Sequence, residues 1–263
     1  ARLGSHSVPL SMDSGFKVLE GALTYLGDLE AAYDPATRKL VSLQVRDEAS
    51  AVQSRLRAAN APLLERYPLN KRVQLFYQLC QAVAYAHNKG VIHRDIKPSN
   101  VMIGDFGDVV LLDWGLCKII GQEVRSSRAA GERWQTVHGQ IIGTPAYMAP
   151  EQALGMIDQI TTATDVYGLG ALLYHFITLA PPFLGKTKRE VVNKVLHGEL
   201  TSPRERAPQA NISAALEAVC LRCMLRDAEQ RYADASELAE AVQEVINIAA
   251  SGSHGVNSSE RAT

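Results

Sequence analysis

Apolar residues in the second half of the chain recur at helical spacing. Between residues 69 and 89 they fall at Val73, Phe76, Leu79, Cys80, Val83 and Ala84, and Asn88-Lys89-Gly90 follows as a stop signal. The run Val166–Ala180 is apolar and ends at Pro181-Pro182, which predicts a buried helix too short to cross a membrane. Further helices are predicted at about 187–197, 213–225 and 234–249. We therefore expect a helical unit with its own core over residues 68–250.

Two short apolar runs interrupt this helical pattern. Val101–Ile103 and Val109–Leu112 flank Gly104–Asp108, which predicts a hairpin. Polar and small residues dominate the chain ends, and we expect residues 1–15 and 251–263 to be disordered.

Charge and cysteine content narrow the classes of partner. With 27 Lys and Arg against 28 Asp and Glu, the net charge of −1 predicts neither nucleic-acid nor membrane binding. Cys220 and Cys223 lie in a helical pattern with no second pair, so we interpret them as core thiols rather than zinc ligands. We see no signal peptide and no membrane segment, and we expect a cytoplasmic protein.

The stretch His93-Arg94-Asp95-Ile96-Lys97-Pro98-Ser99-Asn100 carries the strongest chemical signal. Phosphoryl transfer needs a carboxylate beside the attacking hydroxyl and an oxygen ligand for Mg²⁺, which Asp95 and Asn100 can supply. Asp113-Trp114-Gly115 follows the apolar run 109–112, so a strand would deliver a second metal-binding carboxylate. Ala149-Pro150-Glu151 comes later in the chain.

These motifs, in this order and at these intervals, resemble those of the eukaryotic-like Ser/Thr protein kinases, in particular the bacterial members. The resemblance implies an α+β, kinase-like fold with a mainly helical large lobe at 68–250 and a reduced, β-rich small lobe at 16–67. It also implies ATP and Mg²⁺ as cofactors and a protein substrate with Ser or Thr, and it does not indicate the oligomeric state.

By the same resemblance, Asp95 is the base, Lys97 steadies the γ-phosphate, and Asn100 and Asp113 hold the metal. Lys97 and Thr144 mark Ser/Thr specificity, with Thr144 bonded to Asp95. A phosphate in the loop between Gly115 and Gly143 would pair with Arg94; the acceptors there are Ser126, Ser127 and Thr136.

Three further residues are expected to support this site. Asp165 opens the apolar helix Val166–Leu179, where free backbone N–H groups would stabilise its carboxylate, and the resemblance implies bonds to the catalytic-loop backbone. Glu151 and Arg231 match a pair that is buried in kinases.

The nucleotide-binding half departs from the family pattern. Leu29–Pro35 resembles a small-lobe strand and turn, which puts the three glycine-loop positions at Ala22, Thr24 and Gly27. Gln44 then replaces the lysine that grips the α- and β-phosphates. The 24 residues between Gln44 and Leu69 are too few for two helices of about 11 residues, two strands of about 5 and a hinge.

The departures leave several functions open. The chain is either a Ser/Thr protein kinase, a pseudokinase that acts as a binding module, or an inactive truncated kinase. A small-molecule phosphotransferase ranks below these, because Gly143–Glu151 resembles a peptide-binding segment.

Overall fold

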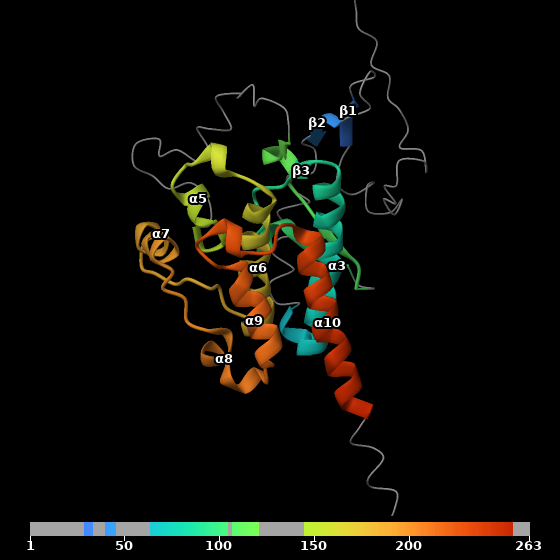
Figure 1. Cartoon of the computed structure of the whole chain (residues 1–263), viewed down its shortest axis with the longest axis vertical. Coiled ribbons are helices and arrows are strands. Elements are labelled where there is room, and N and C mark those ends of the chain that lie inside the picture. The colour runs from blue at the N-terminus through green and yellow to red at the C-terminus, as the bar shows by residue number, and fades with distance from the viewer. Residues whose placement is uncertain (1–28, 34–39, 46–63, 105–106, 121–144, 255–263) are drawn as a thin grey trace, which may run out of the picture.

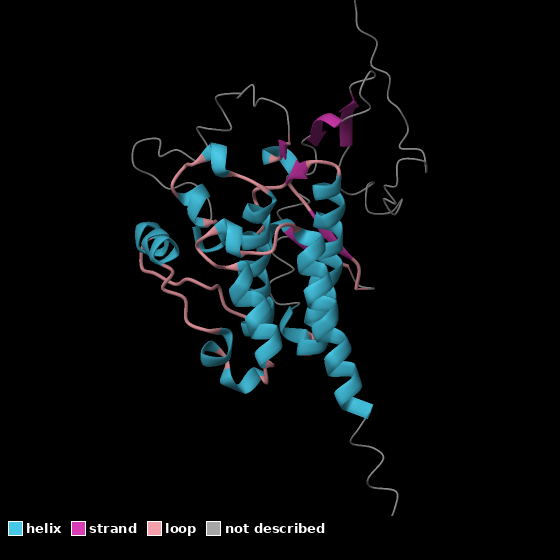
Figure 2. Cartoon of the chain, viewed as in Figure 1, coloured by secondary structure: helices cyan, strands magenta, loops and turns pink. Residues whose placement is uncertain are grey.

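The computed structural model describes residues 29–33, 40–45, 64–104, 107–120 and 145–254. Most of these residues are helical, and the strands are few and short (Figures 1 and 2). The fold is therefore the expected one, a helical lobe preceded by a small strand-containing part. In the described ranges no helix is long and apolar enough to pass through a membrane.

Helix α3 (Leu69–Asn88) follows the predicted apolar pattern, with its regularly spaced side chains buried in the core. It ends before Gly90, whose φ of +75° suits glycine best. Phe76 packs edge-on against Phe176 of helix α6 at a centroid distance of 6.2 Å. The predicted helix is confirmed.

Helix α6 (Thr162–Thr178) is buried around most of its circumference, as its apolar composition predicts. The predicted start at Asp165 is wrong, because the helix begins three residues earlier, at Thr162. Thr161 precedes it in extended backbone, and its N–H donates to Thr164 Oγ1 over 3.1 Å. Threonine is a favoured residue at this position, so capping chemistry, rather than the apolar run, sets the start.

Helix α10 (Ala235–His254) lies alongside α3, and α9 (Ala214–Cys223) packs on α6 (Figure 1). Gly170 allows the second contact, because a Cβ at this position would lie 2.4 Å from Cys223 Cβ. Cys220 and Cys223 are buried free thiols, as expected of core residues, and burial raises both of their pKa values. Helix α10 was predicted to end at residue 249 but continues to His254.

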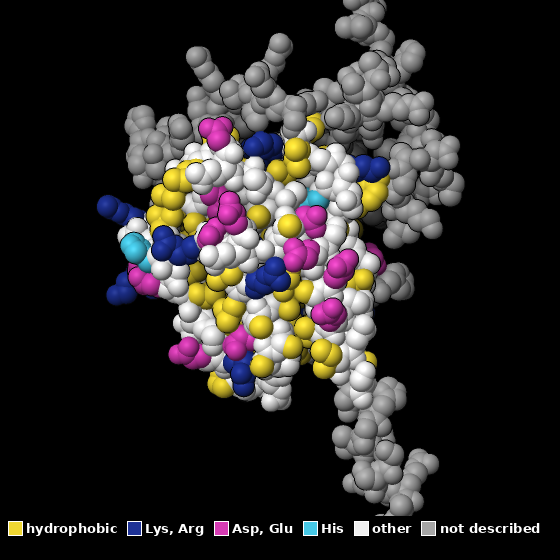
Figure 3. All heavy atoms as spheres, in the orientation of Figure 1, with side chains coloured by type: hydrophobic (Ala, Val, Ile, Leu, Met, Phe, Trp, Pro, Cys, Tyr) yellow, Lys and Arg dark blue, Asp and Glu magenta, His cyan; other side chains and the backbone are white. Residues whose placement is uncertain are grey.

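The shorter helices cover one side of this core: α5 (Pro150–Ala153), α7 (Lys188–His197) and α8 (Pro203–Arg206). Single 3₁₀ turns connect the elements at Pro98–Asn100, Trp114–Leu116, Pro145–Tyr147, Ile157–Gln159, Pro208–Ala210 and Ala228–Gln230. In Figure 3, basic side chains gather at the edge formed by α7 and acidic ones over α10. Val191 and Val195 of α7 are buried, so this helix turns its apolar side inward.

The described strands form three antiparallel pairs. β1 (Leu29–Tyr33) pairs with β2 (Leu40–Val45), which sets Glu30 opposite Gln44 in the register. β4 (Val101–Ile103) pairs with β5 (Val109–Leu111), and this confirms the predicted hairpin. β3 (Val91–Ile92) pairs with β6 (Lys118–Ile119), a contact that the sequence pattern did not predict.

Candidate active site

The loop from His93 to Asn100 connects β3 to β4 and is tied to α6 by one carboxylate. Asp165, 1% exposed, accepts the backbone N–H groups of His93 and Arg94, each over 2.7 Å. It also accepts a bond from His87 Nε2 at 3.0 Å, and His87 Nδ1 accepts the N–H of Ala235. Asp165 therefore anchors the loop backbone, as the resemblance implied, although it lies inside the helix rather than at its first position.

The buried ring of His93 connects this loop to the residue that follows β5. Its Nε2 faces Leu112 O at 3.0 Å and its Nδ1 faces the N–H of Asp95 at 3.2 Å, so Nε2 carries the proton. The Trp114 ring packs edge-on at 4.6 Å between centroids. Burial lowers the pKa of His93, which keeps the ring neutral and its two hydrogen bonds intact.

Asp95 is held in place by two neighbouring side chains. Lys97 Nζ lies 2.6 Å from Oδ2 and 2.9 Å from Oδ1 of Asp95. Asn100 Nδ2 donates to Asp95 O at 2.8 Å and to Oδ2 at 3.0 Å. The structure thus brings three of the predicted catalytic residues together.

The side chain of Asn100 has an unusual environment. Because Nδ2 bonds two acceptors, the other end of the amide must be oxygen. This Oδ1 is buried and has no hydrogen-bond partner among the described residues. An unpaired buried acceptor costs about 1–3 kcal/mol, and an oxygen ligand of this kind suits Mg²⁺.

Asp113 follows β5, where the hairpin brings its backbone next to the catalytic loop. The N–H of Leu112 donates to Asn100 O over 2.7 Å, so Asp113 directly follows a residue bonded to Asn100. Asp113 has φ +66°, a left-handed conformation that is uncommon outside glycine and is found at functional sites. The carboxylates of Asp113 and Asp95 both raise the pKa of His93, but the effect of burial is larger and lowers it.

Arg94 also adopts the left-handed conformation, with φ +69°. Its guanidinium donates to the backbone carbonyls of Leu116 and, at 3.4 Å, Cys117. By the kinase resemblance, the chain from Asp113 to Glu151 is the activation segment, so Arg94 binds the start of this segment. Ser126, Ser127 and Thr136 lie outside the described residues, and the predicted phosphate contact stays a prediction.

Glu151 and Arg231 form the expected buried pair. The guanidinium contacts both carboxylate oxygens, at 2.9 and 3.0 Å, with the Arg231 and Glu151 side chains 0% and 7% exposed. Arg231 therefore fixes α5, at the end of the activation segment, to the segment that follows α9.

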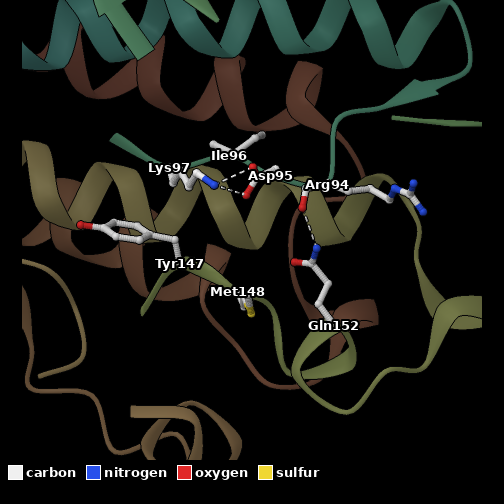
Figure 4. Close-up of a pocket in the computed structure, with 7 residues that line it drawn as sticks. All are labelled: Arg94, Asp95, Ile96, Lys97, Tyr147, Met148 and Gln152. Carbon is white, nitrogen blue, oxygen red and sulfur yellow. Dashed lines mark hydrogen bonds and ion pairs between the residues drawn. The ribbon is translucent and has the colours of Figure 1, made fainter. Parts of the chain in front are cut away.

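A small cavity lies between the catalytic loop and α5 (Figure 4). Its lining combines Arg94, Asp95, Ile96 and Lys97 with Tyr147, Met148 and Gln152. Gln152 and Tyr147 were not singled out from the sequence. Tyr147 OH bonds His175 Nδ1 at 2.9 Å across to α6.

The remaining predicted residues are placed only in part. Gln44 belongs to β2, as the small-lobe interpretation requires. Gly27 and Thr144 lie outside the described residues.

A helical lobe that presents Asp95, Lys97 and Asn100 beside Asp113, just after a strand, matches the large lobe of a protein-kinase-like fold. The family model described as "Protein kinase domain" matches residues 53–245. The chain belongs to the protein kinase domain family, whose members use ATP, usually with Mg²⁺, and act on protein substrates.

Among its relatives, Serine/threonine-protein kinase PknD of Protochlamydia amoebophila is 38% identical over 181 residues, which are 66% of this chain and 18% of that protein. Serine/threonine-protein kinase PknD of Chlamydia pneumoniae is 35% identical over 189 residues, 69% of this chain and 20% of that protein. The chain thus spans about a fifth of the length of these curated relatives.

Proposed function

We propose that the chain transfers the γ-phosphoryl group of ATP to a Ser or Thr hydroxyl of a protein substrate. The observation that carries this proposal is the Asp95 carboxylate, fixed by Lys97 and Asn100 beside a buried amide oxygen that has no hydrogen-bond partner in the described part of the chain. The relatives named as Ser/Thr protein kinases support the substrate class.

Each side chain then has one role. Asp95 accepts the proton of the hydroxyl as its oxygen bonds to the γ-phosphorus, and the bond from that phosphorus to the β-phosphate oxygen breaks to release ADP. Lys97 uses two hydrogens on Asp95 in the structure and has a third for the γ-phosphate. Asn100 and Asp113 would hold Mg²⁺, which supplies charge neutralisation at the phosphates.

Phosphate transfer to an unstructured Ser/Thr-rich protein tests this proposal. Asp95→Asn should lower the rate by about 10²–10⁴-fold, since a positioned base contributes that much. Asn100→Leu, which removes the amide oxygen, should raise the Mg²⁺ concentration needed for half-maximal rate. Equal rates in wild type and Asp95→Asn would refute the proposal.

The second candidate, a nucleotide-binding module without turnover, rests on Gln44 in β2. If Gln44 stands for the phosphate-gripping lysine, one charge-assisted contact of about 1.5–3 kcal/mol is missing. Gln44→Lys should then raise the transfer rate roughly 10- to 100-fold. ATP-dependent thermal stabilisation without transfer, in wild type and in Gln44→Lys alike, would favour the second candidate.

A further inference from the structure

Gln152 links two parts of the active site through a single buried amide. Its Oε1 accepts the N–H of Ala149 at 3.1 Å, and its Nε2 donates to Arg94 O at 2.7 Å (Figure 4). Gln152 as a whole is 7% exposed. One partner is a donor and the other an acceptor, so the orientation of the amide is fixed.

The carbonyl of Arg94, which accepts the hydrogen bond from Gln152, lies next to the catalytic base. It belongs to the peptide that joins Arg94 to Asp95, and Arg94 has a left-handed backbone that costs about 1–2 kcal/mol outside glycine. Asp165 binds the N–H groups on one side of this carbonyl, and Asn100 binds Asp95 O on the other. Gln152, 58 positions from Arg94 in the sequence, supplies the hydrogen bond to the carbonyl that lies between these two contacts.

We propose that Gln152 is a positioning residue that couples the peptide-binding end of the activation segment to the catalytic base. This inference rests on the proposed kinase function. A displacement of α5 would, through the amide, rotate the peptide that precedes Asp95 and turn the carboxylate away from the hydroxyl. Misplacement by about 1 Å costs on the order of 100-fold in rate.

The variant Gln152→Glu tests this inference, because a purely structural role for Gln152 predicts no dependence of its effect on pH. A protonated Glu can donate to Arg94 O as the amide does, whereas an ionised Glu has no proton to donate there. The ratio of variant to wild-type kcat should therefore fall as pH rises. The wild-type profile, measured in parallel, supplies the pH dependence of the other groups near this amide: Arg94, Asp95, Lys97 and Tyr147 line the same cavity, and Glu151 is the neighbouring residue.

Two companion variants complete the design. Gln152→Met, with a side chain of similar length and no amide, should lower kcat roughly 10- to 100-fold at every pH and leave KM for ATP unchanged. Gln159→Glu is the matched control, because Gln159 is exposed in the 3₁₀ turn that follows α5, and its ratio should stay flat with pH. A flat ratio for Gln152→Glu, or Gln152→Met within twofold of wild type, would overturn the inference.

Hydrogen exchange separates this inference from the kinase proposal. In Gln152→Met, amides of residues 91–100 should exchange faster, while those of α3 and α10 should not change. If the wild type transfers no phosphate, the kinase proposal fails and the exchange data still decide the role of Gln152. If Gln152→Met does not fold, exchange in Gln152→Glu relative to wild type at the same pH, compared at low and high pH, decides it instead.

Discussion

Replacing Arg231 with alanine would remove five hydrogen bonds from one buried side chain. Two run to the Glu151 carboxylate, and the others, of 2.7–3.0 Å, run to the carbonyls of Leu225, Ala163 and Arg226. The variant would leave a carboxylate buried without its counterion. Breaking such a pair costs about 3–5 kcal/mol, a large part of the roughly 5–15 kcal/mol that stabilises a typical domain.

Urea denaturation followed by circular dichroism measures this loss as a change in the free energy of unfolding. Arg204→Ala serves as the control, because the Arg204 side chain is 55% exposed and its guanidinium lies 3.8 Å from Glu217, so the loss should stay below about 1 kcal/mol. Arg231→Met combined with Glu151→Leu should be more stable than Arg231→Met alone, since no charge is then stranded. A loss for Arg231→Ala no larger than that of the control would refute the reasoning.

Two further predictions concern the core around the site. Burial lowers the folded-state pKa of His93, so the unfolded chain binds the extra proton more readily and stability should fall as pH drops below about 6.5. His93→Gln should flatten this dependence of the unfolding free energy on pH, and an unchanged slope would contradict it. Gly170→Ala should destabilise by about 1–3 kcal/mol in urea, because its Cβ would meet Cys223 Cβ. Since this exchange normally stabilises a helix, equal or higher stability would disprove the close contact.

The sequence predicted those elements whose signal is local. Helix α3 and the β4–β5 hairpin have regular apolar spacing and clear turn residues, and both form as expected. Glu151 and Arg231 were paired in advance because the family motif identifies them. The predicted start of α6 is wrong because it takes Asp165 as the N-terminal residue of the helix. Thr161 and Thr164 cap the helix instead.

Other features depend on contacts between distant segments. Strands β3 and β6 have two residues each, too few for a pattern, and they pair only because the chain returns to the same place. Gln152 follows Ala149-Pro150-Glu151 directly, yet nothing in the sequence near it indicates that Arg94 O is its partner. Arg94 has a left-handed backbone that arginine does not favour alone, and its N–H and carbonyl are held by Asp165 and Gln152, which are distant in the sequence.

The hydrogen bonds that fix the backbone of the catalytic loop come from residues outside β1 and β2. Buried backbone groups of an irregular loop need partners, and here these come from Asp165, Asn100 and Gln152. All three belong to the helical lobe or to the loop itself, so the orientation of Asp95 depends on the core around α6 rather than on β1 and β2. On the proposed role of Gln44, a change there would act on nucleotide binding and alter the rate of transfer, while Asp95 stays in place.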